Sequence, residues 1–292
     1  MHSLTRNWIC WLKRLMPNDE FLASVLELGW SSYQSVSVER FKNGELSTVD
    51  DFVAEEVPVV LMYNGVSHVV MLATPTNLED FALGFSLTEG IIANAAELES
   101  AKVYQRSNGI EVQLKIPEAR FQCLADKGRN LTGRTGCGLC GATTLKQAIK
   151  PTRSVSGNLK ISPEHLKSVA LLSQHQKLNQ LTGAIHAVAW VEPEKGIVEL
   201  REDVGRHNAL DKLIGALLKR GTDFGAGFMI TTSRASYEMV QKATAVGVTV
   251  LVAISAPTAL AIRLAQESGL TLIGFARDET CVIYSHSQRF ME

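Results

Sequence analysis

The sequence predicts an α/β fold in which a larger C-terminal domain follows a smaller N-terminal α+β domain. Three observations carry this prediction: strands joined by Asn-Gly in the first half, alternating strands and helices in the second half, and a length of 292 residues. That length is ordinary for two domains. We place an N-terminal extension at residues 1–30, the small domain at 31–130 and the larger domain at 131–292.

The first half is predicted to consist of β-hairpins around one helix. Asn-Gly occurs at 43–44, 64–65 and 108–109, each time between strand-forming residues. Because this dipeptide tolerates the positive φ angles of a type I′ turn, it is typical of a two-residue hairpin. The segment after the second hairpin predicts a helix that Asn77 caps and Gly90 ends.

The second half is predicted to alternate apolar strands with amphipathic helices. In chain order, strand and helix in turn, these elements are expected at residues 227–233, 236–247, 248–255, 257–269 and 271–276. Near-continuous apolar strands separated by helices are typical of a parallel sheet with helices packed on it. A final apolar segment at 281–285 is expected to return beside the last of these strands. Pro257 suits the first turn of the helix predicted at 257–269.

The composition excludes several classes of protein. The 29 Lys and Arg residues nearly balance the 30 Asp and Glu residues, and a net charge of -1 disfavours a general nucleic-acid surface. There is no apolar run of about 18 residues that would cross a membrane. The 5 cysteines occur without a visible export signal, which predicts a cytoplasmic protein with reduced thiols.

Loops that follow parallel strands are expected to meet at the carboxyl edge of the sheet. Arg234 and Arg277 lie in two of these loops, and helix N-termini beside them favour anions. One interpretation of this edge is a site for a phosphate-bearing ligand. The other is that the hydroxyl groups cap helices and the arginines are solvated.

Residues 201–208 place two arginines, two carboxylates, a glycine and a histidine before a predicted helix. Glu202 and Asp203 could accept hydrogen bonds from a guanine edge, and Arg206 could bind a phosphate. An internal ion-pair network is the alternative. His186 begins a predicted strand and is expected to be a hydrogen-bonded core residue more often than a catalyst.

The most specific motif is a Cys-x-x-Cys pair, Cys137 and Cys140, within a loop that holds four glycines. A thiol beside Arg134 and near a helix N-terminus is expected to have a lowered pKa, and the thiolate is the nucleophile. Structural zinc would need two further ligands at motif spacing, and a thioredoxin-like pair would follow the first strand of a small domain. A persulfide carrier needs one accessible thiolate, and the loop suits that role best, although spacing alone does not prove it.

Several motifs together resemble the formate dehydrogenase accessory protein family, known as FdhD. The resemblance runs from about residue 35 to the C-terminus, and one departure is Ala184, where the family usually has glycine. The motifs that carry it are DFALGFSLTEGII, GRTGCGLCG, REDVGRHNALDKLIG, SRASYEMVQKA, SAPTALA and TLIGFAR.

The resemblance implies a sulfurtransferase. It would accept persulfide sulfur from a cysteine desulfurase on Cys137, with Cys140 as companion. The acceptor would be the bis(molybdopterin guanine dinucleotide) molybdenum cofactor, bound as substrate, and the second protein partner would be apo-formate dehydrogenase. The segment that would contact the cofactor is Phe275, Ala276, Arg277, Asp278, Glu279 and Thr280.

The resemblance also implies a cytidine-deaminase-like α/β domain. Deamination is excluded because zinc deaminases need His-x-Glu, and no histidine here has glutamate two residues later; no structural metal is expected. The alternative function is a non-catalytic chaperone that binds the cofactor and inserts it into apo-formate dehydrogenase. We expect no nucleic-acid or membrane partner. A homodimer would suit a cofactor with two dinucleotide arms, although no residue pattern indicates one.

Overall fold

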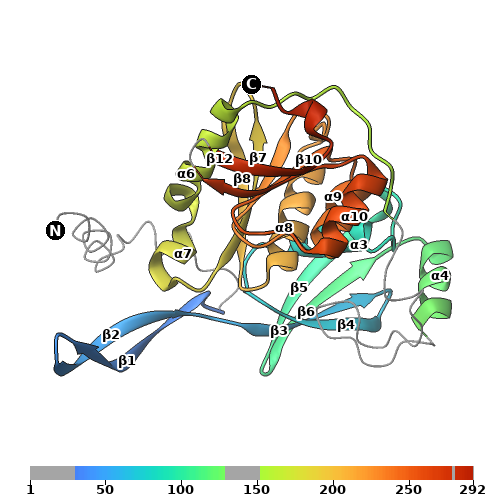
Figure 1. Ribbon diagram of the computed structural model, residues 1–292. Helices are drawn as coiled ribbons and strands as arrows, with labels where there is room; N and C mark the ends of the chain where they lie inside the picture. Colours follow the sequence, from blue (N-terminus) through green and yellow to red (C-terminus); the bar gives the residue numbers. More distant parts are fainter. Residues whose placement is uncertain (1–29, 129–151, 278–279, 292) are drawn as a thin grey trace.

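The computed structural model describes residues 30–128, 152–277 and 280–291, and Figure 1 shows how its elements are arranged. Strands and helices alternate between residues 196 and 277, as an α/β fold requires, which confirms the predicted class. Within the described ranges the strands form a two-stranded, a four-stranded and a six-stranded sheet. The predicted domain boundary at 130/131 lies outside the described residues, so that division stays a prediction.

The two-stranded sheet is a hairpin of β1 (Tyr33–Lys42) and β2 (Glu45–Ala54). Asn43 and Gly44 form its turn with φ angles of 55° and 89°, so the Asn-Gly prediction is confirmed here. Figure 1 shows the hairpin, in blue, projecting away from the rest of the molecule. Its base packs on a small apolar cluster that includes Leu178 and Ile185.

The four-stranded sheet has the order β4-β3-β6-β5. Apolar residues on one of its faces pack against α3, and this forms the core of the N-terminal half. The elements of this half are β3 (Val57–Tyr63), β4 (Val66–Ala73), α3 (Leu78–Thr88), η2 (Ala95–Glu97), β5 (Ser100–Arg106), β6 (Gly109–Lys115) and α4 (Glu118–Gly128).

The other two Asn-Gly pairs behave differently. Asn64 and Gly65 form the β3–β4 turn with φ angles of 48° and 86°, as predicted. In the third hairpin Arg106 pairs with Gly109, so the turn residues are 107 and 108 and the prediction of an Asn-Gly turn is wrong. Gly109 serves close packing instead, because a Cβ atom there would lie 2.4 Å from the carbonyl oxygen of Pro58.

The six-stranded sheet has the order β12-β11-β10-β9-β7-β8. Its strands β9, β10 and β11 are parallel, as predicted, whereas β7, β8 and β12 pair antiparallel with their neighbours. The strands are β7 (His186–Glu192), β8 (Gly196–Asp203), β9 (Phe228–Thr231), β10 (Val250–Ala253), β11 (Thr271–Arg277) and β12 (Thr280–Ser285).

Helices cover both faces of this sheet. Apolar residues of α8, α9 and α10 pack on one face, and residues of α6 pack on the other. The helices are η3 (Pro163–Leu166), α6 (Lys167–His175), α7 (Lys177–Thr182), α8 (Arg206–Lys219), α9 (Tyr237–Ala245), α10 (Ala259–Ser268) and η4 (Ser287–Arg289).

Two predicted helix starts need correction. Asn77 precedes α3, but its backbone is left-handed at a φ of 51° and its side chain makes no capping hydrogen bond. Thr258 is the N-cap residue of α10, because its hydroxyl accepts the N–H of Ala261 at 3.2 Å, and Ala259 is the first residue of the helix. Pro257 therefore lies just before the helix.

Helices α3 and α8 join the two larger sheets at a very close crossing. A Cβ atom at Gly84 of α3 would lie 1.8 Å from the carbonyl oxygen of Asp211. A Cβ atom at Gly215 of α8 would lie 1.9 Å from the carbonyl oxygen of Asp80. Only glycine allows this approach, so the crossing fixes the small sheet against the larger one.

Buried charges at this crossing all have partners of opposite charge; we call them the interface ion pairs. Lys212 lies 2.7 Å from Asp203, and both side chains are fully buried. Lys242 lies 2.8 Å from Asp211 and 3.1 Å from Glu89. Although burial lowers the pKa of Lys242, these two carboxylates raise that pKa above its ordinary value, so the amine stays charged. The third pair, Arg201 with Asp80, is 2.8 Å long.

Candidate functional site

The predicted site residues divide into those that the structure describes and those that it does not. Cys137 and Cys140 lie outside the described residues, as do Asp278 and Glu279. The roles predicted for them stay predictions. Of the predicted cofactor segment, Phe275, Ala276, Arg277 and Thr280 are described, and they join β11 to β12.

The loops after β9, β10 and β11 meet at the carboxyl edge, as predicted. Ala235 forms a parallel bridge with Pro257. The Thr258 N–H donates to the carbonyl oxygen of Ala235 at 3.0 Å, and the Phe275 N–H donates to that of Ser255 at 3.3 Å. Three segments far apart in the sequence are therefore held together by backbone contacts.

Phe275 has an unusual backbone and an unusual exposure. It lies in a bulge, because β11 places Phe275 and Ala276 between two register pairs where β12 has only Cys281. Its φ of 52° is left-handed, which is rare for an aromatic residue, and 47% of its surface is exposed. Strained residues of this kind are concentrated at functional sites. Ala276, by contrast, is fully buried, so its methyl group faces the core.

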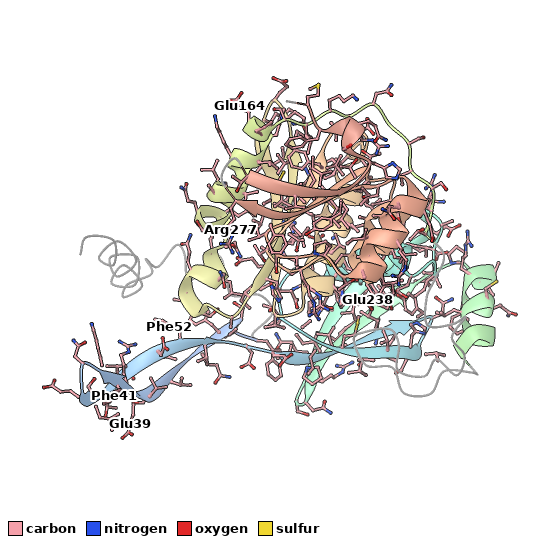
Figure 2. All side chains as sticks on the ribbon, viewed as in Figure 1. Glu39, Phe41, Phe52, Glu164, Glu238 and Arg277 are labelled. Atoms are coloured by element: carbon pink, nitrogen blue, oxygen red, sulfur yellow. The ribbon has the colours of Figure 1, made fainter. Side chains whose placement is uncertain are left out.

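A second group of side chains lies on the same edge; we call it the edge cluster. Its members are His186, Arg206, His207, Arg234, Ser236 and Glu238. His207 links two elements, because its Nε2 lies 2.6 Å from Glu238 Oε2 and 3.2 Å from Ser236 Oγ. The Ala187 N–H donates to Thr232 Oγ1 at 2.9 Å and so holds the start of β7 beside the loop that carries Arg234. Figure 2 shows Glu238 well apart from Arg277.

Arg206 is the first residue of α8. Its Nε atom is buried and has no hydrogen-bond partner among the described residues. Burial lowers the pKa of Arg206, the positive charge of Arg234 lowers it further, and Glu238 opposes both. The arrangement places two guanidinium groups within electrostatic range of each other.

His186 lies at the start of β7, opposite Asp203 in the β7–β8 register. Burial lowers its pKa from the ordinary value, and the charges of Arg206 and His207 lower it further, against the effect of Asp203. The imidazole is therefore neutral at neutral pH. His186 therefore belongs to the edge cluster. The expectation of a core residue agrees with the structure only in that the side chain is partly buried.

The guanine-edge interpretation of Glu202 and Asp203 is wrong. Glu202 accepts the backbone N–H groups of Leu178 and Asn179 at 3.0 and 2.9 Å. Asp203 accepts the N–H groups of Gly205 and Thr74 at 2.8 and 3.1 Å, in addition to its pair with Lys212. Glu202 and Asp203 thus belong to an internal network of ion pairs and hydrogen bonds, which agrees with the alternative interpretation of this segment.

Three further observations concern a cavity, metal ions and membranes. A cavity of about 450 Å³ lies beside β8, lined among others by Lys177, Glu199 and Arg201. Across the described ranges, no three His, Cys, Asp or Glu residues gather closely enough to hold a metal ion. None of the helices there is both long and apolar enough to cross a membrane.

Comparison with known proteins identifies the family. Residues 54–291 match the model of the FdhD/NarQ family. The chain is 49% identical over 259 residues to the sulfur carrier protein FdhD of Cupriavidus necator, an alignment that covers 88% of this chain and 90% of that protein. It is also 49% identical over 254 residues to the sulfur carrier protein FdhD of Xanthomonas euvesicatoria, with coverages of 87% and 90%.

A solved structure supports the fold. It is a crystal structure described as that of a formate dehydrogenase accessory protein from Desulfotalea psychrophila. The TM-score is 0.68 at 21% identity, over 89% of this chain and 99% of the other. The likeness to cytidine deaminases stays a prediction. The sequence comparisons and the shared fold agree, and the chain belongs to the FdhD/NarQ family.

Proposed function

We propose that this chain is a sulfur carrier that serves formate dehydrogenase. The observation that carries the proposal is that relatives about half identical to it, over nine-tenths of their length, are named sulfur carrier protein FdhD. The sulfur donor is a cysteine desulfurase, and the acceptor is the bis(molybdopterin guanine dinucleotide) molybdenum cofactor. The reaction takes place in the cytoplasm, where thiols stay reduced.

Cys137 and Cys140 carry out the sulfur chemistry. The Cys137 thiolate attacks the terminal sulfur of the desulfurase persulfide, forms a new S–S bond and releases the desulfurase cysteine as a thiolate. Attack of the Cys140 thiolate on the Cys137 sulfur then forms a disulfide and releases the carried atom as sulfide for the molybdenum. A cellular dithiol reduces the disulfide and restores both thiols.

The carboxyl edge of the larger sheet binds the cofactor. Phe275 presents an exposed aromatic ring on which a guanine base can stack, and exposed Arg277 presents a guanidinium group with phosphate geometry. We expect Arg277→Ala to weaken the binding of GDP by about tenfold. Arg263→Ala, on the exposed surface of α10, is the matched control. Equal affinity in the two variants would remove Arg277 from the site.

The decisive experiment for sulfur transfer is mass spectrometry after incubation with a cysteine desulfurase and cysteine. We expect a gain of about 32 Da, one sulfur atom, on the peptide that contains Cys137. Cys123→Ala serves as the matched control, because Cys123 is an exposed free cysteine outside the motif. A gain on Cys123 and none on Cys137 would refute the assignment.

The non-catalytic chaperone is separated from the carrier by the same variant in cells. A Cys137→Ala protein that still activates formate dehydrogenase would favour the chaperone. Loss of activation, with cofactor binding retained, would favour the carrier. Both functions require the cofactor edge, so only the cysteine distinguishes them.

A further inference from the structure

The β1–β2 hairpin carries the two most exposed large apolar side chains in the described ranges. Phe41 is 72% exposed and Leu46 is 61% exposed, although both are residue types that proteins usually bury. They lie directly opposite each other in the antiparallel register, beside the turn at 43–44, so their side chains share one face. Figure 2 shows Phe41 and Glu39 at the far end of the hairpin, remote from the larger sheets. We call Phe41 and Leu46 the hairpin tip.

The hairpin is supported only at its base. Among the described residues its sheet has two strands, so the outer edges of both ten-residue strands are open. A two-stranded hairpin alone is at best marginally stable in water. At the base, Tyr33 and Ala54 pack on Ile185, and the rings of Tyr33 and Phe52 meet edge-on at 5.5 Å. This anchor holds the hairpin to the molecule and leaves its tip for a contact outside the chain.

The charges beside the hairpin tip indicate the kind of surface that it fits. Glu39 and Asp50 are exposed on the same face as the tip, because side chains alternate along each strand and Asp50 pairs with Ser37. The two basic residues of the hairpin, Arg40 and Lys42, lie on the opposite face by the same alternation. An apolar tip flanked by carboxylates is complementary to an apolar pocket with a basic rim.

The base of the hairpin lies next to the edge cluster. Ile185 and Val204 belong to the apolar cluster on which the base packs. Ile185 directly precedes His186, and Val204 is two residues before Arg206. A protein that binds the tip and its acidic face is therefore held close to the carboxyl edge of the larger sheet. Under the proposed function the cofactor leaves this edge for the acceptor enzyme, so the position favours the acceptor as the partner.

We infer that the β1–β2 hairpin is a docking arm for apo-formate dehydrogenase, which takes up Phe41 and Leu46 in an apolar pocket with a basic rim. The inference rests on the proposed function, which makes that enzyme the acceptor. The hairpin adds an interaction surface that is distinct from the cysteine pair and from the cofactor edge. A cysteine desulfurase and a second copy of this chain are the other possible occupants, and the test separates them from the acceptor.

The test is surface plasmon resonance between apo-formate dehydrogenase and the full chain. We expect Phe41→Ser to weaken binding by about tenfold or more, because buried aromatic anchors dominate the energy of such interfaces. The variant should melt at the wild-type temperature, since Phe41 is exposed. Val66→Ser is the matched control, because Val66 is 56% exposed beside the turn at 64–65, and it should bind as the wild type does. Equal affinity of Phe41→Ser and wild type, or no binding of the wild type, would overturn the inference.

Charge reversal tests the basic rim of the partner. The double variant Glu39→Lys and Asp50→Lys should associate several-fold more slowly than the wild type at about 50 mM salt. The difference should largely disappear at about 0.5 M salt, because salt screens the attraction. Glu164→Lys is the control, because Glu164 is exposed and lies far from the hairpin in Figure 2. A double variant that associates as fast as the wild type at low salt would contradict recognition of the acidic face.

Two further measurements separate the occupants. Phe41→Ser should still gain one sulfur atom on Cys137 from a cysteine desulfurase; loss of this gain with enzyme binding retained would assign the arm to the desulfurase. Sedimentation should give the same oligomeric state for Phe41→Ser and wild type, and a dimer lost only in the variant would assign the arm to a second copy. Either result overturns the inference. If wild-type Cys137 gains no sulfur while enzyme binding depends on Phe41, the sulfur-carrier proposal fails and the docking arm stands.

Discussion

The α3–α8 crossing and the edge cluster both contain half-buried or buried charges, and they treat them in opposite ways. At the crossing, Lys212 and Lys242 each meet a carboxylate within 2.8 Å. At the edge cluster, the positive charge of Arg234 lowers the pKa of Arg206, and neither arginine forms an ion pair among the described residues. Charges that form ion pairs inside the protein stabilise the fold, whereas positive charges without an ion-pair partner produce an electrostatic potential that attracts an anionic ligand. The residues at the crossing therefore stabilise the fold, whereas those of the edge cluster are candidates for binding a ligand.

The largest effect is expected from removing one partner at the crossing. Lys242→Met leaves Asp211 buried without its counter-charge, and we expect the free energy of unfolding to fall by about 3–5 kcal/mol. Urea denaturation measures this change. Lys219→Met is the matched control, because Lys219 is 44% exposed and its pair with Asp80 should contribute less than about 1 kcal/mol. Similar losses of unfolding free energy in the two variants would show that the buried ion pair is no more important for stability than the exposed one.

The second effect tests the geometry of the crossing. In Gly215→Ala the new methyl group would lie 1.9 Å from the Asp80 carbonyl oxygen, so the helices must separate. We expect a loss of about 3 kcal/mol in thermal denaturation. Gly225→Ala adds the same group to an exposed turn where the nearest atom is 3.2 Å away, and should lose less than about 1 kcal/mol. A stable Gly215→Ala protein would show that the helices can shift freely.

The third effect concerns pH at the edge cluster. Since the pKa of His186 is lowered below its ordinary value of 6.5, the unfolded chain binds more protons than the folded chain as the pH falls through that value. Stability is therefore present above 6.5 and declines on acidification until the folded imidazole is itself protonated. We expect the decline, measured by urea denaturation from about pH 7.5 to about pH 5.5, to be shallower in His186→Gln. A steeper decline would reverse the sign of the argued shift.

The smallest effect is expected from removing an unpaired charge. Arg206→Leu removes both the repulsion with Arg234 and the attraction of Glu238, and it breaks no hydrogen bond of the buried Nε atom. We expect the free energy of unfolding to stay the same or to rise by up to about 0.5 kcal/mol, in contrast to Lys242→Met. Differential scanning calorimetry at low ionic strength measures the change. A loss above about 1 kcal/mol would mean that Arg206 is structural after all.

Much of the fold follows from local sequence. The central strands of the larger sheet are short apolar runs between capped helices, so their order and the meeting of their loops follow from chain connectivity. The Asn-Gly turns at 43–44 and 64–65 follow from backbone conformation alone. The antiparallel placement of β7 and β8 does not, because the pairing of a strand with β9 depends on packing across the whole sheet.

The candidate site is predictable only in part, for the same reason. Arg234 and Arg277 could be assigned to the edge because each follows a predicted strand. The roles of Glu202 and Asp203 could not, since their partners Leu178, Lys212 and Thr74 lie up to 129 residues away in the chain. Phe275 is apolar at the end of an apolar strand, and nothing local signals its left-handed backbone.

The glycine crossing has a consequence for how the chain can be divided. Cutting between β6 and β7 would leave α3 in one fragment and α8 in the other. The first fragment would retain Asp80 without Arg201 and Lys219. The second would retain Lys212 without the carbonyl oxygen of Thr74, to which Lys212 Nζ donates a hydrogen bond at 2.9 Å. Each fragment would expose to water the helix face that carries the crossing glycine and the charged residues. We therefore expect the two fragments to be soluble and folded only when they are produced together.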